Sequence, residues 1–223
     1  MARPSSVRTL VAWMNGLRIG EWRIRHNAPM EFEYDQNWLE NTEARRPLSL
    51  SLPLPLEKAP LVGHVVEDYF DNLLPDSDAI RRRLQSRFHT HSQGAFDLLS
   101  AIGRDCVGAV QLLPGDEEPT GLKEIQARPL SEADVAAALI NTVSPTKFFA
   151  TNEEDPDDFR ISIAGAQEKT AFLFNEGQWC RPIGATPTTH IFKLPLGLVG
   201  AMNADMRTCK RRREIGPVSG GVM

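Results

Sequence analysis

The sequence predicts an α+β fold, in which strands come first and helices follow. Three observations indicate it: an Asn-Gly dipeptide between two extended runs near the N-terminus, helical spacing of apolar residues from Val65 onward, and strands that do not alternate regularly with helices. The chain has 223 residues, of which 41% are hydrophobic and 24% charged, so its composition is that of a globular protein with a buried core. Disordered and fibrous proteins are excluded.

The first expected element is a hairpin over Thr9–Trp22 with Asn15-Gly16 at its turn. Asn-Gly indicates a hairpin because both central residues of such a tight turn must tolerate positive φ. A third strand is expected over Met30–Tyr34, where apolar and acidic residues alternate. The prolines of Pro47–Leu56 predict an edge strand or an irregular extended segment.

Helices are expected next. The apolar residues that share one helical face are Val65, Val66, Tyr69, Phe70, Leu73 and Leu74. Pro75 is expected to end that helix, and Asp76 or Ser77 to cap the following one. A further helix over Phe96–Ile102 leads into a strand over Val107–Leu113.

A polar, acidic stretch over Pro114–Gly121 is the predicted linker between two domains, residues 1–114 and 115–208. Beyond it, Ser131 and Asp134 have the spacing of a capping box, which predicts a helix running through Ile140. Residues 209–223 are expected to form a divergent, disordered tail.

The charge and cysteine content exclude several function classes. The 29 acidic and 25 basic residues give a net charge of −4, which disfavours direct binding of nucleic acid. The cysteines Cys106, Cys180 and Cys209 predict neither a disulfide framework nor a zinc site. With no signal peptide and no membrane segment in the sequence, we expect a cytoplasmic protein that does not bind membranes.

No metal site is expected in this sequence. His89 and His91 lack a carboxylate or cysteine partner at ligand spacing, so a solvated helix end explains them better. A candidate cation-binding cluster is formed by Asp71, Asn72, Asp76 and Asp78, yet helix termination and capping account for these side chains.

The most informative segment is Phe159–Lys169, in which Ala164, Gly165 and Ala166 stand between two extended runs. Such small residues let backbone N–H groups approach an anion, as in a phosphate-binding nest, although a tight turn with a small-residue tip explains them as well. Lys193 lies in a later apolar strand, where it is either a phosphate-binding cation or a charge that protects a sheet edge. Kinases use this order of strand, loop, strand and strand lysine.

Six segments together resemble the HipA family of bacterial toxin kinases. They run in the family's order from about Thr9 to Pro195 and read VAWMNGLRIGEW, RPLSLSLPLP, YFDNLLPDSDAIR, FDLLSAIGRDCVGAVQLLP, DFRISIAGAQEKTAFL and TPTTHIFKLP. Their combined specificity is high. The resemblance implies a HipA-like N-terminal α/β domain followed by the beginning of a protein-kinase-like fold, the small lobe that covers ATP.

The resemblance also implies an activity and partners. Members of the family are ATP- and Mg²⁺-dependent serine/threonine kinases that phosphorylate an aminoacyl-tRNA synthetase, here expected to be the glutamyl enzyme. This modification inhibits translation and promotes persistence. A small helix-turn-helix antitoxin, HipB, holds the kinase in check, and the kinase reaches operator DNA only through that complex.

The family's functional residues transfer onto matching positions of the Phe159–Lys169 segment and the later strand. Ser162 matches the serine that is autophosphorylated, which expels the phosphate loop and inactivates the kinase. The residues expected to contact ATP are Ile163, Ala164, Gly165, Ala166, Gln167, Lys169 and Lys193.

The sequence departs from the family after Thr208. The segments that supply the catalytic aspartate and the Mg²⁺ ligands of the family are not among the 223 residues, and Cys209–Met223 does not resemble it. We therefore expect the N-terminal half of such a kinase, truncated or frameshifted before the large lobe, with no catalytic residues and no kinase activity of its own. The alternative function is a non-catalytic module that binds the HipB-like antitoxin or a full-length HipA.

Overall fold

The computed structural model describes residues 7–57, 59–115, 117–121, 124–143, 164–165, 169–184, 186–193, 198–199 and 204–205. The chain divides into two compact units, Met1–Lys193 and Leu194–Met223, and each is described by itself. The first unit contains two sheets. We call the elements β1–β5 and α1–α4 the five-stranded region, and the elements β6–β9 with α5 the four-stranded region.

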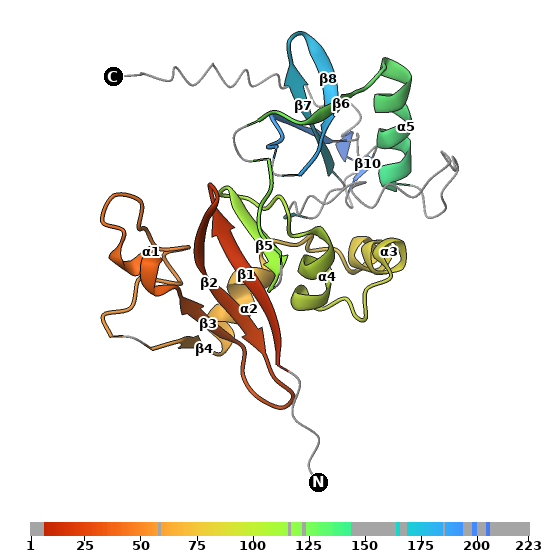
Figure 1. The fold of residues 1–223 in the computed structure, drawn as a ribbon. Coiled ribbons are helices and arrows are strands. Elements are labelled where there is room, and N and C mark those ends of the chain that lie inside the picture. The colour runs from red at the N-terminus through yellow and green to blue at the C-terminus, as the bar shows by residue number, and fades with distance from the viewer. Residues whose placement is uncertain are drawn as a thin grey trace. The chain divides into compact units, whose positions relative to one another are not determined.

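The five-stranded sheet has the order β4-β3-β2-β1-β5, and all neighbours are antiparallel. Its strands are β1 (Arg8–Met14), β2 (Leu17–Ile24), β3 (Glu31–Tyr34), β4 (Leu61–Val62) and β5 (Val110–Pro114). In Figure 1, β1 and β2 form the long red hairpin, and the green β5 lies beside β1. The mixed composition of strands and helices confirms the predicted α+β class.

The predicted first hairpin is confirmed. Asn15 and Gly16 join β1 to β2 with φ angles of 51° and 78°, the left-handed values that a tight hairpin turn requires. A register shift between Ala12 and Trp13 leaves Ile19 as an extra residue in β2, which is the bulged strand of the pair. The third predicted strand is also present, as β3.

The core of this region lies between the sheet and its helices, which are α1 (Gln36–Glu40), α2 (His64–Asp71), α3 (Asp78–Phe88) and α4 (Ala95–Ile102). Trp22 on β2 is fully buried and stacks on Phe70 of α2, with ring centroids 3.9 Å apart and planes 9° apart. Phe96 of α4 packs against the same indole at 4.9 Å. The inward face of β2 thus holds α2 and α4 together.

The proline-containing segment 47–56 is irregular, one of the two forms that the sequence predicted. The Tyr34 hydroxyl fixes it by accepting the Leu48 N–H at 2.7 Å and donating to the Leu52 carbonyl at 2.5 Å. Burial of this hydroxyl raises the pKa of Tyr34 to about 12. As a result Leu52 is fully buried, whereas Leu50 projects into solvent.

Three details of the helices and of β5 differ from the prediction. Helix α2, the first helix that the sequence predicted, ends at Asp71, earlier than Pro75, because the chain turns at Asn72 while still burying the leucines that follow. Val65 is exposed, so it was wrongly assigned to the core face. β5 begins at Val110 because Gly108 and Ala109 have positive φ, which breaks the extended run.

Ser77 occupies the N-cap position of α3, but its side chain makes no capping hydrogen bond. The guanidinium of Arg81 instead ties the start of α3 to the end of α2 by binding the Asp71 carboxylate at 2.6 Å and the Pro75 carbonyl at 2.7 Å. The aspartates near this turn are thereby accounted for as parts of helix ends.

The four-stranded sheet has the order β6-β8-β7-β9. Its strands are β6 (Ala127–Pro129), β7 (Lys169–Asn175), β8 (Gln178–Pro182) and β9 (His190–Lys193), and helix α5 (Glu132–Val143) contacts β7. The predicted capping box is confirmed: the Asp134 N–H donates to the Ser131 hydroxyl at 3.1 Å, and the Ser131 N–H donates to the Asp134 carboxylate at 2.9 Å.

In the second unit, β10 (Leu198–Val199) pairs antiparallel with β11 (Ala204–Asp205). The expected tail, 209–223, lies outside the described residues. Among the residues that are described, no helix combines the length and apolar character needed to cross a membrane.

Candidate functional site

The predicted site residues fall partly within the described structure. Ala164, Gly165, Lys169 and Lys193 are described, whereas Ser162, Ile163, Ala166 and Gln167 lie outside the described residues. The described members meet at one end of the four-stranded sheet, where β7 begins and β9 ends.

The central feature is a pair of lysines on neighbouring strands. Lys169 is the first residue of β7 and Lys193 is the last residue of β9, and the antiparallel register places them directly opposite each other. Side chains at such positions share one face of the sheet, with Cβ atoms about 5 Å apart. Because two like charges there destabilise a sheet, this end of the sheet is suited to an anion that neutralises both.

A turn of the chain lies against the first lysine. The Lys169 ammonium donates a hydrogen bond to the Ala164 carbonyl. Gly165 has φ +111°, which favours glycine, and a Cβ there would lie 2.6 Å from the Lys169 Nζ. A side chain at this position would therefore displace the ammonium from the loop.

The electrostatics of the pair agree with this geometry. Lys169 is half-buried, and burial lowers its pKa from the usual 10.5. The positive charge of Lys193 lowers the pKa further, while the negative charge of Asp76 opposes the shift. An anion placed between the two ammonium groups would raise the pKa of Lys169 again, so anion binding and protonation of Lys169 support each other.

Two acidic residues of the five-stranded region also contact the segments that carry the site. The Asp76 N–H donates to the Gly165 carbonyl at 3.4 Å. The Asp105 carboxylate accepts a hydrogen bond from the Thr188 hydroxyl at 3.1 Å, just before β9. The sequence had suggested Asp76 only as a helix cap and had not indicated Asp105, because its partner lies 83 residues away with no local pattern to link them.

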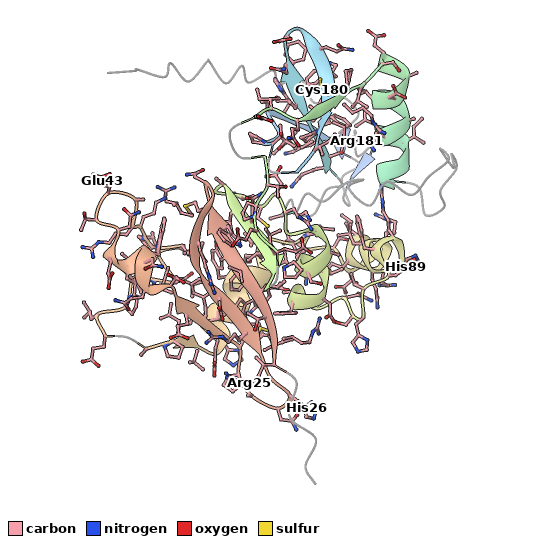
Figure 2. All side chains as sticks on the ribbon, in the orientation of Figure 1. Arg25, His26, Glu43, His89, Cys180 and Arg181 are labelled. Atoms are coloured by element: carbon pink, nitrogen blue, oxygen red, sulfur yellow. The ribbon has the colours of Figure 1, made fainter. Side chains whose placement is uncertain are left out.

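The other face of the four-stranded sheet carries an aromatic cluster made of Phe172, Phe174, Trp179, His190 and Phe192. Phe172 is buried, but Phe174 is 42% exposed. In Figure 2, Cys180 and Arg181 mark β8, the strand that carries Trp179. The ring contacts of the cluster link β7, β8 and β9, two of which carry the lysines.

A metal site is not apparent in the described part of the chain, where no three His, Cys, Asp or Glu side chains gather closely enough to hold an ion. His89 ends α3 with a left-handed φ of 52°, as labelled in Figure 2. Cys106 and Cys180 are buried, and neither forms a disulfide bond within the described part of the chain. The residues that are described therefore fit a phosphate group through lysines, and they offer no cluster of oxygen ligands for Mg²⁺.

Comparisons with known proteins show which family this chain resembles. The family model described as the HipA N-terminal domain matches residues 10–113. Y4mE of Sinorhizobium fredii, a kinase by name, is 32% identical over 194 residues, which are 86% of this chain and 44% of Y4mE. The serine/threonine-protein kinase toxin HipA of Shewanella oneidensis is 26% identical, over 83% of this chain and 40% of the toxin.

The fold is also similar to a solved structure, that of the Shewanella oneidensis HipA, HipB and operator DNA complex. The TM-score is 0.60 at 24% identity, with 83% of this chain and 40% of that chain covered. The chain spans less than half the length of the relatives it matches.

Proposed function

Because the chain belongs to the HipA-like kinase family, we propose that its four-stranded region binds the phosphates of ATP. Lys169 and Lys193 are the paired cations of this proposal, and the loop residues Ile163–Gln167 supply backbone N–H donors. Residues 1–114 form the N-terminal domain and 115–208 the beginning of the kinase domain. The chain is proposed to work in the cytoplasm.

The observation that carries the proposal is the direct cross-strand register of Lys169 and Lys193. A single strand lysine has an alternative explanation as a charge that protects a sheet edge. Edge protection does not explain two lysines at opposed positions, because their like charges weaken the pairing of the two strands. Hydrogen bonds to a phosphate from two ammonium groups, each contributing roughly 1.5–3 kcal/mol, would more than offset that cost.

The activity proposed for the full-length kinase is transfer of a phosphoryl group to a serine or threonine of an aminoacyl-tRNA synthetase. The glutamyl-tRNA synthetase is the first candidate substrate. This transfer inhibits translation and promotes persistence. Ser162 is the proposed site of autophosphorylation. A phosphate there would carry a charge of about −1.5 to −2 and would compete with ATP for the same cations.

Bound ATP supplies the transferable phosphoryl group, and Mg²⁺ in this family neutralises its charge. The chain's own residues would hold and orient the phosphates and would keep Lys169 protonated. The 223 residues include no family segment for the catalytic aspartate or the metal ligands. We therefore propose that this chain by itself binds nucleotide and does not transfer phosphate.

A second candidate function is a binding module for a HipB-like helix-turn-helix antitoxin or for a full-length HipA. It is favoured by the five-stranded region, which has its own buried core and includes the residues matched by the HipA N-terminal domain. The solved Shewanella oneidensis complex contains HipA, HipB and operator DNA. With a net charge of −4, this chain would reach DNA only through the antitoxin.

Two experiments distinguish the candidates: calorimetric titration of the 223-residue chain with ATP, and co-purification of the chain with a HipB-like antitoxin. Saturable ATP binding that is lost in Lys193→Ala supports the first, and Arg82→Ala is the control because that arginine is an exposed cation of α3. Stable antitoxin capture without ATP binding supports the second. Phosphate incorporation at Ser162 on incubation with Mg-ATP would contradict the proposed lack of transfer.

A further inference from the structure

Asp105 of the five-stranded region is hydrogen-bonded to Thr188, just before β9, and this contact is not part of the strand pairing of either sheet. It lies in the turn between α4 and β5, and its carboxylate accepts a hydrogen bond from the Thr188 hydroxyl at 3.1 Å. The carboxylate is half-buried, and burial raises the pKa of Asp105, while its interaction with Thr188 acts in the opposite direction. A carboxylate that is partly removed from water must accept hydrogen bonds from the protein to offset its lost hydration.

Thr188 leads directly into the strand that carries the second lysine. The next residue, Thr189, donates its N–H to the Phe172 carbonyl at 3.0 Å and accepts the Phe174 N–H on its hydroxyl at 2.7 Å. β9 then runs from His190 to Lys193. The hydrogen bonds at 188 and 189 therefore fix where β9 begins, and with it which residue ends opposite Lys169.

β9 needs such an anchor because it is short. It has four residues, lies at the edge of its sheet and, among the described strands, pairs with β7 alone. A slip of one residue in a strand turns every side chain to the opposite face. Such a slip would move Lys193 to the aromatic face and leave Lys169 without its partner.

We propose that Asp105 is a positioning residue for the phosphate site: by holding Thr188 it keeps β9 in the register that places Lys193 opposite Lys169. This inference rests on the function proposed above, in which the lysine pair binds phosphate. The contact from Asp76 to Gly165 serves the loop in the same way, so the five-stranded region holds both segments of the site.

The test measures amide hydrogen exchange in the 223-residue chain without ligand. Asp105→Ala and Thr188→Val each remove the bond from one side, and Asp68→Ala is the control because that aspartate is exposed on α2. We expect the amides of β9 to exchange about tenfold faster in either variant, as for loss of a charge-assisted hydrogen bond. Exchange in β1 and β2 should not change.

The two substitutions should not add, because they remove the same interaction. The double variant Asp105→Ala/Thr188→Val is expected to exchange in β9 no faster than either single variant, and Asp105→Asn, which keeps an acceptor oxygen, should recover part of the protection. Unchanged β9 exchange in both single variants, or fully additive effects, would overturn the inference. If Asp105→Ala does not fold, Thr188→Val with Asp105→Asn still decides the question.

ATP affinity is the second readout. If ATP binds, it should weaken about tenfold in Asp105→Ala and stay unchanged in Asp68→Ala. If the unmodified chain binds no ATP, the function proposed above fails, whereas the exchange data still decide whether Asp105 controls β9. The two failures are therefore distinguishable.

Discussion

The two regions of the first unit each contain a tryptophan on a central strand, and the surroundings of these two side chains differ. Trp22 of the five-stranded region is fully buried between Phe70 and Phe96. Trp179 of the four-stranded region is half-buried, and its neighbours Phe174 and His190 are exposed. The first sheet is covered by its helices, whereas the second keeps much of one face accessible.

This difference teaches where stability and binding reside. A closed core supplies most of the free energy of folding, so the five-stranded region can hold its neighbour in place. The four-stranded region bears opposed lysines that weaken its own strand pairing. The repulsion between these lysines lowers the stability of the sheet and at the same time suits it to bind an anion. The hydrogen bond of Asp105 connects the stable region to the binding region.

The largest expected effect comes from replacing the two tryptophans. Trp22→Ala should lower the free energy of unfolding by about 3–5 kcal/mol, because it leaves a cavity in a closed core. Trp179→Ala should cost clearly less, since its site is partly open to water. Chemical denaturation of both variants checks this ranking.

Trp22→Phe is the matched control for that comparison. The Trp22 indole N–H has no hydrogen-bond partner among the described residues, so its loss removes no bond. Phenylalanine should therefore retain most of the stability that alanine loses. Equal losses for Trp22→Ala and Trp179→Ala would break the distinction between the two regions.

The next effect separates binding from stability. Lys169→Ala and Lys193→Ala should each weaken ATP binding by roughly tenfold to a hundredfold, the loss of one charge-assisted hydrogen bond. Neither should lower the melting temperature through the strand pair, because each removes a like-charge repulsion. Calorimetry and thermal unfolding on the same samples measure both quantities, and a large loss of stability without loss of ATP affinity would refute the assignment.

A smaller effect is expected at the first hairpin turn. Gly16→Ala places a Cβ where φ is 78°, which should cost about 1–2 kcal/mol of stability. The turn lies in the five-stranded region, so ATP affinity should stay unchanged at temperatures where the variant is folded. Urea unfolding together with an ATP titration tests whether stability falls while ATP affinity stays the same.

The smallest effect is a pH dependence. The pKa of Lys169 is lowered in the free protein, and bound phosphate should raise it. ATP affinity is then highest at pH values below the pKa of Lys169 in the free chain, which itself lies below the usual 10.5. The affinity falls as the pH rises through that pKa. ATP affinity measured from pH 7 upward should decline in the unmodified chain and stay flatter in Lys169→Ala.

Features that depend on neighbouring residues could be predicted from the sequence. Asn15-Gly16 fixed the first turn and Ser131 with Asp134 the start of α5, because these residues satisfy nearby backbone groups. Val65 was misplaced because helical spacing alone does not show how wide the covered face of α2 is. The start of β5 was missed because a positive φ at Ala109 has no signal in its residue type.

The candidate site could be predicted only in its parts. Small loop residues and a strand lysine were visible in the sequence, and the family resemblance added Lys169. Their meeting depends on the register of β7 and β9, which is set by distant bonds such as that from Thr188 to Asp105. No local pattern encodes a contact across 83 residues.

The most direct test of the central claim, that Lys169 and Lys193 share a phosphate, is an NMR titration of the lysine side chains with and without ATP. The account predicts a pKa of Lys169 below its usual value in the free chain that rises when ATP is added, with a simultaneous shift of the Lys193 resonance. An unchanged Lys169 pKa at saturating ATP would contradict it.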